Sequence, residues 1–172
     1  MDNLKEDKMR GKSFKFGDNI STDHIAPGRL FHLRSNLEEF AKHVLEDADV
    51  DFAKNVQKGD FIVAGNNFGL GSSREHAPQI IKIAGVGAVL AKSFARIFYR
   101  NAINIGLLAI ECDTDRINAG DELDLDIKNG ILKNITQGFD IQIAPVPEVM
   151  INLLNDGGLI EHIKKHQDLI LK

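Results

Sequence analysis

The chain has 172 residues, 43% of them apolar, and a formal net charge of −4 from 21 basic and 25 acidic residues. This length predicts one domain with a buried core, and the acidic balance disfavours nucleic acid as the main partner. The single cysteine, Cys112, excludes an internal disulfide and fits a reducing compartment. No apolar run approaches the length of a membrane span, and the polar N-terminus is unlike a signal peptide. We therefore expect a cytoplasmic protein that makes no contact with membranes.

The first part of the chain predicts alternating strands and helices. Residues 1–10 are polar and charged and are expected to form a flexible extension, followed by a single domain over residues 11–172. A short strand at 13–16 and a long loop at 17–34 precede a helix that begins after Asn36, a favourable N-cap residue. Apolar runs then predict strand 60–64, helix 75–84, strand 88–91, helix 97–105 and strand 107–111. This alternation is typical of a layered α/β fold with parallel strand pairing.

The remainder of the chain predicts antiparallel strands followed by helices. Apolar and acidic residues alternate over 122–127, which is the pattern of a half-buried strand. Asn129-Gly130 is a tight-turn signal, so the apolar residues from Ile131 onward are expected to return as a hairpin, with another strand at 139–143. Two helices are then predicted, at 148–154 and at 159–166, with two glycines between them.

The most informative segment is residues 65–78, with the sequence GNNFGLGSSREHAP. A predicted strand enters it and a predicted helix leaves it, and glycines between the two allow the backbone to approach a ligand closely. The start of a helix favours an anion. Arg74 adds a guanidinium that can bind a carboxylate through two hydrogen bonds, and Ser72 and Ser73 place hydroxyls beside it. The segment predicts a carboxylate-binding active-site loop with Ser72 as the candidate base.

Three other interpretations of this loop compete with that one. A phosphate-binding P-loop would need a lysine where Leu70 and Gly71 stand, and a dinucleotide fingerprint would need a glycine at position 74. A capping box with Ser72 as N-cap and Glu75 three residues later is more credible, although Pro78 makes the position of the cap uncertain. Helix capping alone does not account for three glycines and an arginine together, so the functional interpretation is preferred.

A second segment, GDNISTDHIAPG at residues 17–28, by itself indicates only a polar surface turn. Together with residues 69–78 and with AKSFARIFYRN at residues 91–101, it resembles the small subunit, or swivelling domain, of the aconitase and 3-isopropylmalate dehydratase family. The resemblance covers nearly the whole chain from about Arg10. It implies an α/β fold of the swivelling β/β/α type and a hydro-lyase that moves a hydroxyl between adjacent carbons of a malate-like acid.

The resemblance implies roles for individual residues. Ser72 matches the serine that acts as base and removes the carbon-bound proton. Ser73 and Arg74 match contacts to substrate carboxylates, and Thr22 and Asp23 match active-site residues of the first loop.

Four more residues near these motifs are candidates. His24, Glu75 and His76 flank the motifs and are expected to orient the residues that contact the substrate, without contacting it themselves. Arg34 lies near the position of a first-loop arginine that binds the extra carboxylate of tricarboxylic substrates, but it could equally be a surface residue.

The substrate expected from the resemblance is 3-isopropylmalate, in leucine biosynthesis. Homoaconitase and 2,3-dimethylmalate dehydratase stay open as alternatives, because GRLFHLRSN at residues 28–36 lacks the tyrosine-leucine pair that isopropylmalate-type small subunits tend to carry. An alternative of another class is a non-catalytic module that binds anions for regulation.

The resemblance also implies a [4Fe–4S] cluster held by three cysteines. Since this chain has only Cys112, we expect no metal on it, a cluster on a separate large subunit, and activity only in that complex. Cys112 is expected to pack in or near the core. His162 and His166 have a spacing that would suit a metal, but their place near a helix C-terminus favours solvated side chains.

Overall fold

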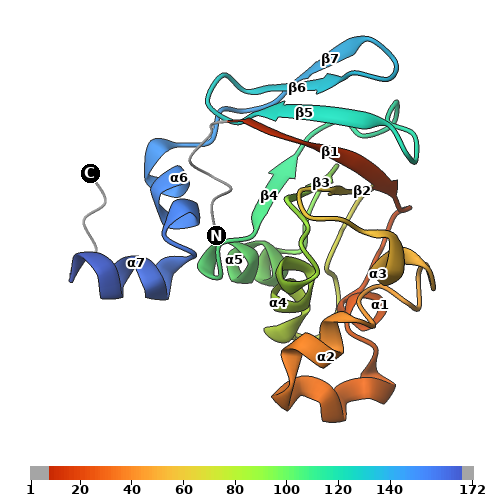
Figure 1. The fold of residues 1–172 in the computed structure, drawn as a ribbon, viewed down its shortest axis with the longest axis vertical. Helices are drawn as coiled ribbons and strands as arrows, with labels where there is room; N and C mark the ends of the chain where they lie inside the picture. The colour runs from red at the N-terminus through yellow and green to blue at the C-terminus, as the bar shows by residue number, and fades with distance from the viewer. Residues whose placement is uncertain (1–7, 168–172) are drawn as a thin grey trace.

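The computed structural model describes residues 8–167 (Figure 1). The strands are β1 (Lys8–Lys15), β2 (Phe61–Ala64), β3 (Ala88–Ala91), β4 (Leu108–Glu111), β5 (Glu122–Asp126), β6 (Ile131–Asn134) and β7 (Phe139–Gln142). The helices are α1 (Thr22–Ile25), the 3-10 helix η1 (Gly28–Ser35), α2 (Leu37–Ala41), α3 (Phe52–Asn55), α4 (His76–Ile83), α5 (Arg96–Asn104), α6 (Glu148–Asn155) and α7 (Leu159–His166).

The strands of the described residues form one seven-stranded sheet in the order β4-β3-β2-β1-β5-β6-β7. Strands β4, β3, β2 and β1 pair in parallel, and β5, β6 and β7 form an antiparallel meander. Strand β1 belongs to both halves, because its start pairs with β5 and its end pairs with β2. The structure thus confirms the predicted α/β class, with a parallel half followed by a hairpin-rich half.

The parallel half of the sheet is buried on both faces, which explains its continuous apolar runs. Along β2, Ile62 and Ala64 pack into the cluster that contains buried residues of α2, α4 and α5. Phe61 and Val63 point to the opposite face and pack with residues of β5 and β6. Helices therefore cover one face of the parallel strands, while the antiparallel half curls over the other, as Figure 1 shows. This layering is the β/β/α arrangement that the family resemblance implies.

The start of β1 differs from the prediction. Residues 8–10, placed in the flexible extension by the sequence analysis, are strand residues that pair with residues 124–126 of β5. Pairing with a segment so distant in sequence leaves no local signal, which explains the error. Residues 1–7 of the predicted extension lie outside the described residues.

The predicted long loop at 17–34 contains α1 and η1. The N–H of His24 donates to the Ser21 hydroxyl over 3.1 Å, and the Ser21 N–H donates to His24 Nδ1 over 3.0 Å. This is a capping box in which histidine takes the place that glutamate or glutamine usually fills. The predicted cap of α2 is confirmed, because Asn36 Oδ1 accepts the Glu39 N–H over 3.2 Å.

The capping box at Ser72, which was the competing interpretation of this loop, does not form. Helix α4 begins at His76, its N-cap residue is Glu75, and no side chain caps it. Pro78 lies in the first turn, where its missing N–H costs least, and its ring disfavours a helix that begins much earlier. Ser72 therefore lies in the loop before the helix.

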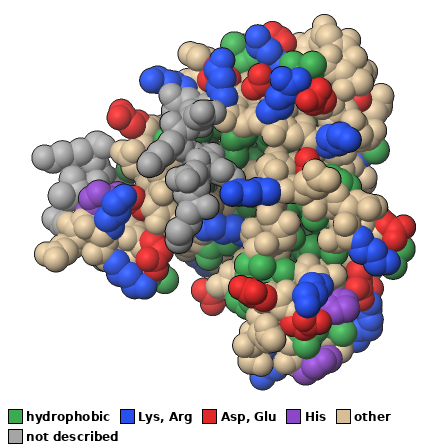
Figure 2. Space-filling view, in the orientation of Figure 1, with side chains coloured by type: hydrophobic (Ala, Val, Ile, Leu, Met, Phe, Trp, Pro, Cys, Tyr) green, Lys and Arg blue, Asp and Glu red, His purple; other side chains and the backbone are tan. Residues whose placement is uncertain are grey.

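Figure 2 shows acidic and basic side chains intermingled over the described part of the visible face. Among residues 8–167, none of the helices has both the length and the apolar character needed to cross a bilayer.

Candidate active site

The loops that follow β1, β2 and β3 meet at the carboxyl ends of these parallel strands, where α/β sheets commonly place their sites. Backbone hydrogen bonds join the loops: Gly69 N donates to Ile20 O over 2.7 Å, and Phe68 N donates to Ser93 O over 3.0 Å. The three segments that carry the family resemblance therefore lie side by side.

The glycine loop, residues 65–75, contacts α5 through an aromatic cluster. The rings of Phe68 and Phe98 meet edge to face with centroids 5.2 Å apart, and Phe94 stacks on Phe98 at 6.2 Å. Gly69 has φ +83°, and a Cβ there would lie 2.3 Å from Cγ of Phe98. Only glycine allows this approach, so the residue type at position 69 lets the loop lie directly on the helix.

A cavity of about 390 Å³ opens between the glycine loop and the start of α5. Its polar lining includes the hydroxyl residues Thr22, Ser72 and Ser73 and the guanidinium residues Arg74 and Arg96. Hydroxyls and guanidiniums are the groups that proteins use to bind carboxylates. The cavity can therefore accept an anionic small molecule.

Arg74 is held in place by the first loop. Its Nη1 donates to Asp23 Oδ1 over 2.8 Å and to the Ala26 carbonyl over 2.6 Å. Asp23 Oδ1 also accepts the Gly28 N–H over 2.9 Å. The hydrogen bond from Arg74 is the main cause that lowers the pKa of Asp23 below its usual value, so this carboxylate stays ionised beside the guanidinium. Among the described residues, Arg74 lines the cavity and Asp23 does not.

The backbone of Ser72 is fixed from the first loop as well. Thr22 is only 4% exposed, and its hydroxyl donates to the Ser72 carbonyl over 2.9 Å. Ser72 and Ser73 are themselves exposed at the cavity. Helix α4 begins at His76, four residues after Ser72, so Ser72 does not lie in its first turn as the sequence analysis expected. Arg74, Arg96 and the first turn of α5 line the same cavity as Ser72.

His76 lies behind Arg74 in an aromatic setting. Its ring stacks on Phe40 with centroids 5.4 Å apart and contacts Phe31 at 5.8 Å. Burial, with smaller contributions from the charges of Arg74 and Arg34, lowers the pKa of His76 below its usual value. The neutral imidazole is therefore favoured behind the site.

The remaining predicted candidates surround the cavity without lining it, as far as the described residues show. The guanidinium carbon of Arg34 lies 4.3 Å from the centroid of the Phe31 ring, and its Nη1 donates to the Phe31 carbonyl over 3.2 Å. His24 bonds to Ser21 within the cap of α1. Glu75 is exposed at the start of α4.

Arg96, Ile97 and Asn101 line the cavity, and the sequence analysis assigned them no role. They belong to residues 91–101, which served only to identify the family. Two signals could have found them. Arg96 follows the loop after β3, at the same sheet edge as the glycine loop. Ile97 and Asn101 are four residues apart, which places them on one face of α5.

Cys112 does not suit a metal site. Burial raises the pKa of its thiol to about 12, so it stays protonated at neutral pH. An iron–sulfur cluster needs several thiolates, and this chain has one shielded thiol. The residues of this chain do not fit such a cluster.

The curled mixed sheet, with a cavity at the carboxyl ends of its parallel strands, defines an α/β domain of the swivelling type. The family model described as the aconitase C-terminal domain matches residues 13–115, and the chain belongs to this family.

Similar proteins agree with this assignment. The chain is 62% identical over 162 residues to 3-isopropylmalate dehydratase small subunit 2 of Archaeoglobus fulgidus, covering 94% of this chain and 98% of the relative. It is 65% identical over 159 residues to small subunit 1 of Thermotoga maritima, covering 92% and 96%. The crystal structure of a 3-isopropylmalate dehydratase from Methanocaldococcus jannaschii matches with a TM-score of 0.88 and 42% identity, covering 93% of this chain and 95% of that one. These findings confirm the resemblance and the fold class predicted from the sequence.

Proposed function

We propose that this chain is the small subunit of a 3-isopropylmalate dehydratase. Such an enzyme is a hydro-lyase that interconverts 2- and 3-isopropylmalate by dehydration and rehydration, a step of leucine biosynthesis. The observation that carries the proposal is the cavity in which Ser72, Arg74 and Arg96 meet. The names of relatives 62% and 65% identical to this chain support the same substrate.

In this proposal Ser72 is the base that removes the carbon-bound proton. A serine hydroxyl is a weak base at its ordinary pKa and needs positive surroundings that favour the alkoxide. Arg74 and Arg96, which line the same cavity, supply that charge. Arg74 and Ser73 bind a substrate carboxylate, while Thr22 fixes the backbone of Ser72.

The loop behind the cavity keeps these groups in position. Asp23 accepts a hydrogen bond from Nη1 of Arg74 and so fixes the guanidinium. The nearby ring of His76 has a lowered pKa and therefore adds no further positive charge. We infer from these contacts that Asp23 positions Arg74, whereas the family resemblance suggested that Asp23 contacts the substrate.

The apolar part of the cavity favours a branched malate over a tricarboxylic acid. The apolar residues Ala95, Ile97 and Phe98 are part of the lining, and Ile97 is 44% exposed. An isopropyl group would cover that exposed surface. Arg34, the candidate for an extra carboxylate, instead lies over the Phe31 ring.

We place the [4Fe–4S] cluster on a separate large subunit, because the one thiol of this chain is shielded. When bound there, the cluster supplies Lewis-acid chemistry at the leaving hydroxyl. This chain contributes the base and the carboxylate contacts, so the active site is complete only in the complex.

The test is reconstitution under anaerobic conditions with the large subunit. Each subunit alone should be inactive, and the mixture should dehydrate 3-isopropylmalate with a higher kcat/KM than homoaconitate-type or 2,3-dimethylmalate substrates. A visible iron–sulfur absorbance on this chain alone would contradict the placement of the cluster on the large subunit. A preference for a tricarboxylic acid would overturn the substrate and leave the hydro-lyase assignment intact.

A further inference from the structure

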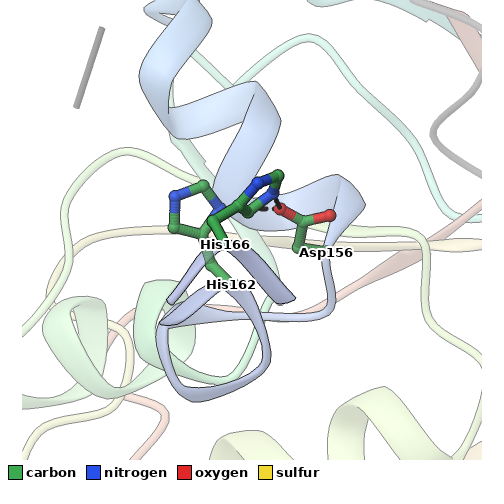
Figure 3. A group of neighbouring side chains, drawn as sticks. All are labelled: Asp156, His162 and His166. Atoms are coloured by element: carbon green, nitrogen blue, oxygen red, sulfur yellow. Dashed lines mark hydrogen bonds and ion pairs between the residues drawn. The ribbon is translucent and has the colours of Figure 1, made fainter. Parts of the chain in front are cut away.

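Two histidines and an aspartate converge at the junction of α6 and α7, outside the cavity described above (Figure 3). His162 Nδ1 lies 2.6 Å from Asp156 Oδ2, and His166 Nε2 lies 2.8 Å from the same oxygen. One possible ligand atom from each of the three residues lies within 4.8 Å of the other two. None of these residues has a role in the proposed reaction.

Two of the three side chains are fixed, and one faces solvent. The side chains of Asp156 and His162 are each 6% exposed, whereas that of His166 is 41% exposed. The sequence analysis expected both histidines to be solvated, and for His162 this is wrong. Its place one turn before His166 puts both rings on the face of α7 that meets Asp156.

The turn between the helices preforms this arrangement. Gly158 has φ +115°, and a Cβ there would lie 2.3 Å from the Asn104 carbonyl oxygen of α5. Lys82 donates to the Gly157 carbonyl over 3.4 Å and to the Ile105 carbonyl over 2.6 Å, which ties the turn to the end of α5. The position of Asp156 relative to α7 is therefore set by backbone packing.

The donor set suits a transition-metal ion. Two imidazole nitrogens and a carboxylate oxygen are ligands of Zn²⁺, and bonds of about 2.0–2.1 Å place tetrahedral ligand atoms roughly 3.3 Å apart. The present separations of 2.6 and 2.8 Å need to widen by roughly 0.5 to 0.7 Å to reach that value. The exposed ring of His166 can supply that movement.

The surroundings of Asp156 also suit a metal-binding carboxylate. Lys165 Nζ donates to Asp156 Oδ1 over 2.5 Å, while both histidines face Oδ2. Ligating carboxylates are commonly oriented by such an outer partner on the second oxygen.

We propose that Asp156, His162 and His166 bind one divalent transition-metal ion of the Zn²⁺ type. The ligand atoms are Asp156 Oδ2, His162 Nδ1 and His166 Nε2, and water completes the coordination on the solvent side. The site is structural: the ion joins α7 to the end of α6.

The test uses the tag-free, metal-stripped full chain titrated with Zn²⁺ by calorimetry and with Co²⁺ by visible absorption. One equivalent of metal should bind, Co²⁺ should show d–d bands, and Zn²⁺ should raise the melting temperature. His166→Gln removes an exposed ligand without opening the core and should weaken binding by about 10-fold or more. The matched control is His32→Gln, at an exposed histidine of η1, which should bind as the wild type does.

Either of two results overturns the proposal: no saturable binding to the folded wild-type chain, or binding to His166→Gln as tight as to the wild type. In both cases the cluster is a hydrogen-bonded group around Asp156. Asp156→Asn, checked for folding by circular dichroism, gives a second test of the same ligand set. Binding is measured on this chain alone, so its failure leaves the proposed enzymatic function untouched.

Discussion

The backbone of Ser72 is fixed by Thr22, whereas its side chain is exposed at the cavity. We expect Ser72→Ala to lower kcat of the reconstituted enzyme roughly 10²–10⁴-fold, which is the usual effect of removing a positioned base. Thermal stability should stay unchanged, because the hydrogen bond from Thr22 goes to the Ser72 carbonyl. Steady-state kinetics and thermal melts of the complex measure the two effects.

Ser73→Ala is the matched control, since it removes a neighbouring exposed hydroxyl of the same loop. It should act mainly on KM, as a carboxylate contact would. Near-normal turnover in Ser72→Ala would show that another group is the base.

Arg74 combines two contacts that a lysine cannot reproduce together. Its Nη1 donates to both Asp23 and the Ala26 carbonyl, and Arg74 is also a lining residue of the cavity. Losing one hydrogen bond to a charged group costs about 1.5–3 kcal/mol, so Arg74→Lys should raise KM roughly 10- to 100-fold. Asp23→Asn keeps the side-chain shape and should have a smaller effect in the same assay. Equal KM values for Arg74→Lys and the wild type would exclude Arg74 as the carboxylate contact.

His76 predicts a pH dependence of stability. Because its folded pKa is lowered, the unfolded chain binds a proton on this residue at a higher pH than the folded chain does. Its contribution to stability is therefore complete above the unfolded pKa of about 6.5 and is lost as the pH falls below it. His76→Phe keeps a ring against Phe40 but cannot titrate, so the free energy of unfolding should fall less between pH 7 and pH 5. Urea unfolding at both pH values measures this free energy. An equal fall between pH 7 and pH 5 in His76→Phe and in the wild type would contradict the prediction.

Gly69 allows the glycine loop to pack directly against Phe98 of α5. Ala at this position would combine a left-handed backbone, at φ +83°, with a contact of 2.3 Å to Phe98. The backbone strain alone costs about 1–2 kcal/mol, and the clash must also displace the loop. Gly69→Ala should therefore destabilise the chain by more than that and lower the activity of the complex.

Gly138→Ala is the control for this change, because Gly138 has φ +75° and a Cβ added there would meet nothing within 4 Å among the described residues. It should show the backbone strain alone, with full activity. Chemical unfolding of both variants separates strain from steric clash. Similar losses in the two variants would mean that Phe98 moves aside easily.

At the scale of elements, local patterns predicted most of the fold. The apolar run at 88–91 matches β3, and the Asn129-Gly130 signal correctly indicated the β5–β6 hairpin. The missed elements lack those patterns. Helix α1 is capped by His24, which a search for glutamate or glutamine overlooks, and the start of β1 depends on pairing with β5.

At the scale of the molecule, the sequence predicted Ser72 and Arg74 as neighbours in one loop but could not bring Thr22 beside them. That contact depends on parallel pairing of β1 with β2. The alternation of strands and helices indicated parallel pairing but not which strands are neighbours. Burial of His162 likewise depends on a turn packed against α5. Long-range packing leaves little trace in a short window of sequence, so these features required the structure.

Cys112 reports on the integrity of the whole fold. It packs against the buried cluster between β4 and the antiparallel strands, and burial raises its pKa to about 12. The thiolate is the reactive form, so the shift from about 8.5 should slow its labelling at pH 8 on the order of 10³-fold relative to the unfolded chain. Labelling with a chromogenic disulfide across a urea series measures this, and the rate should rise together with global unfolding. A native chain labelled as fast as the unfolded one would show that the thiol is accessible and ionisable, which would reopen the question of whether it could serve as a metal ligand.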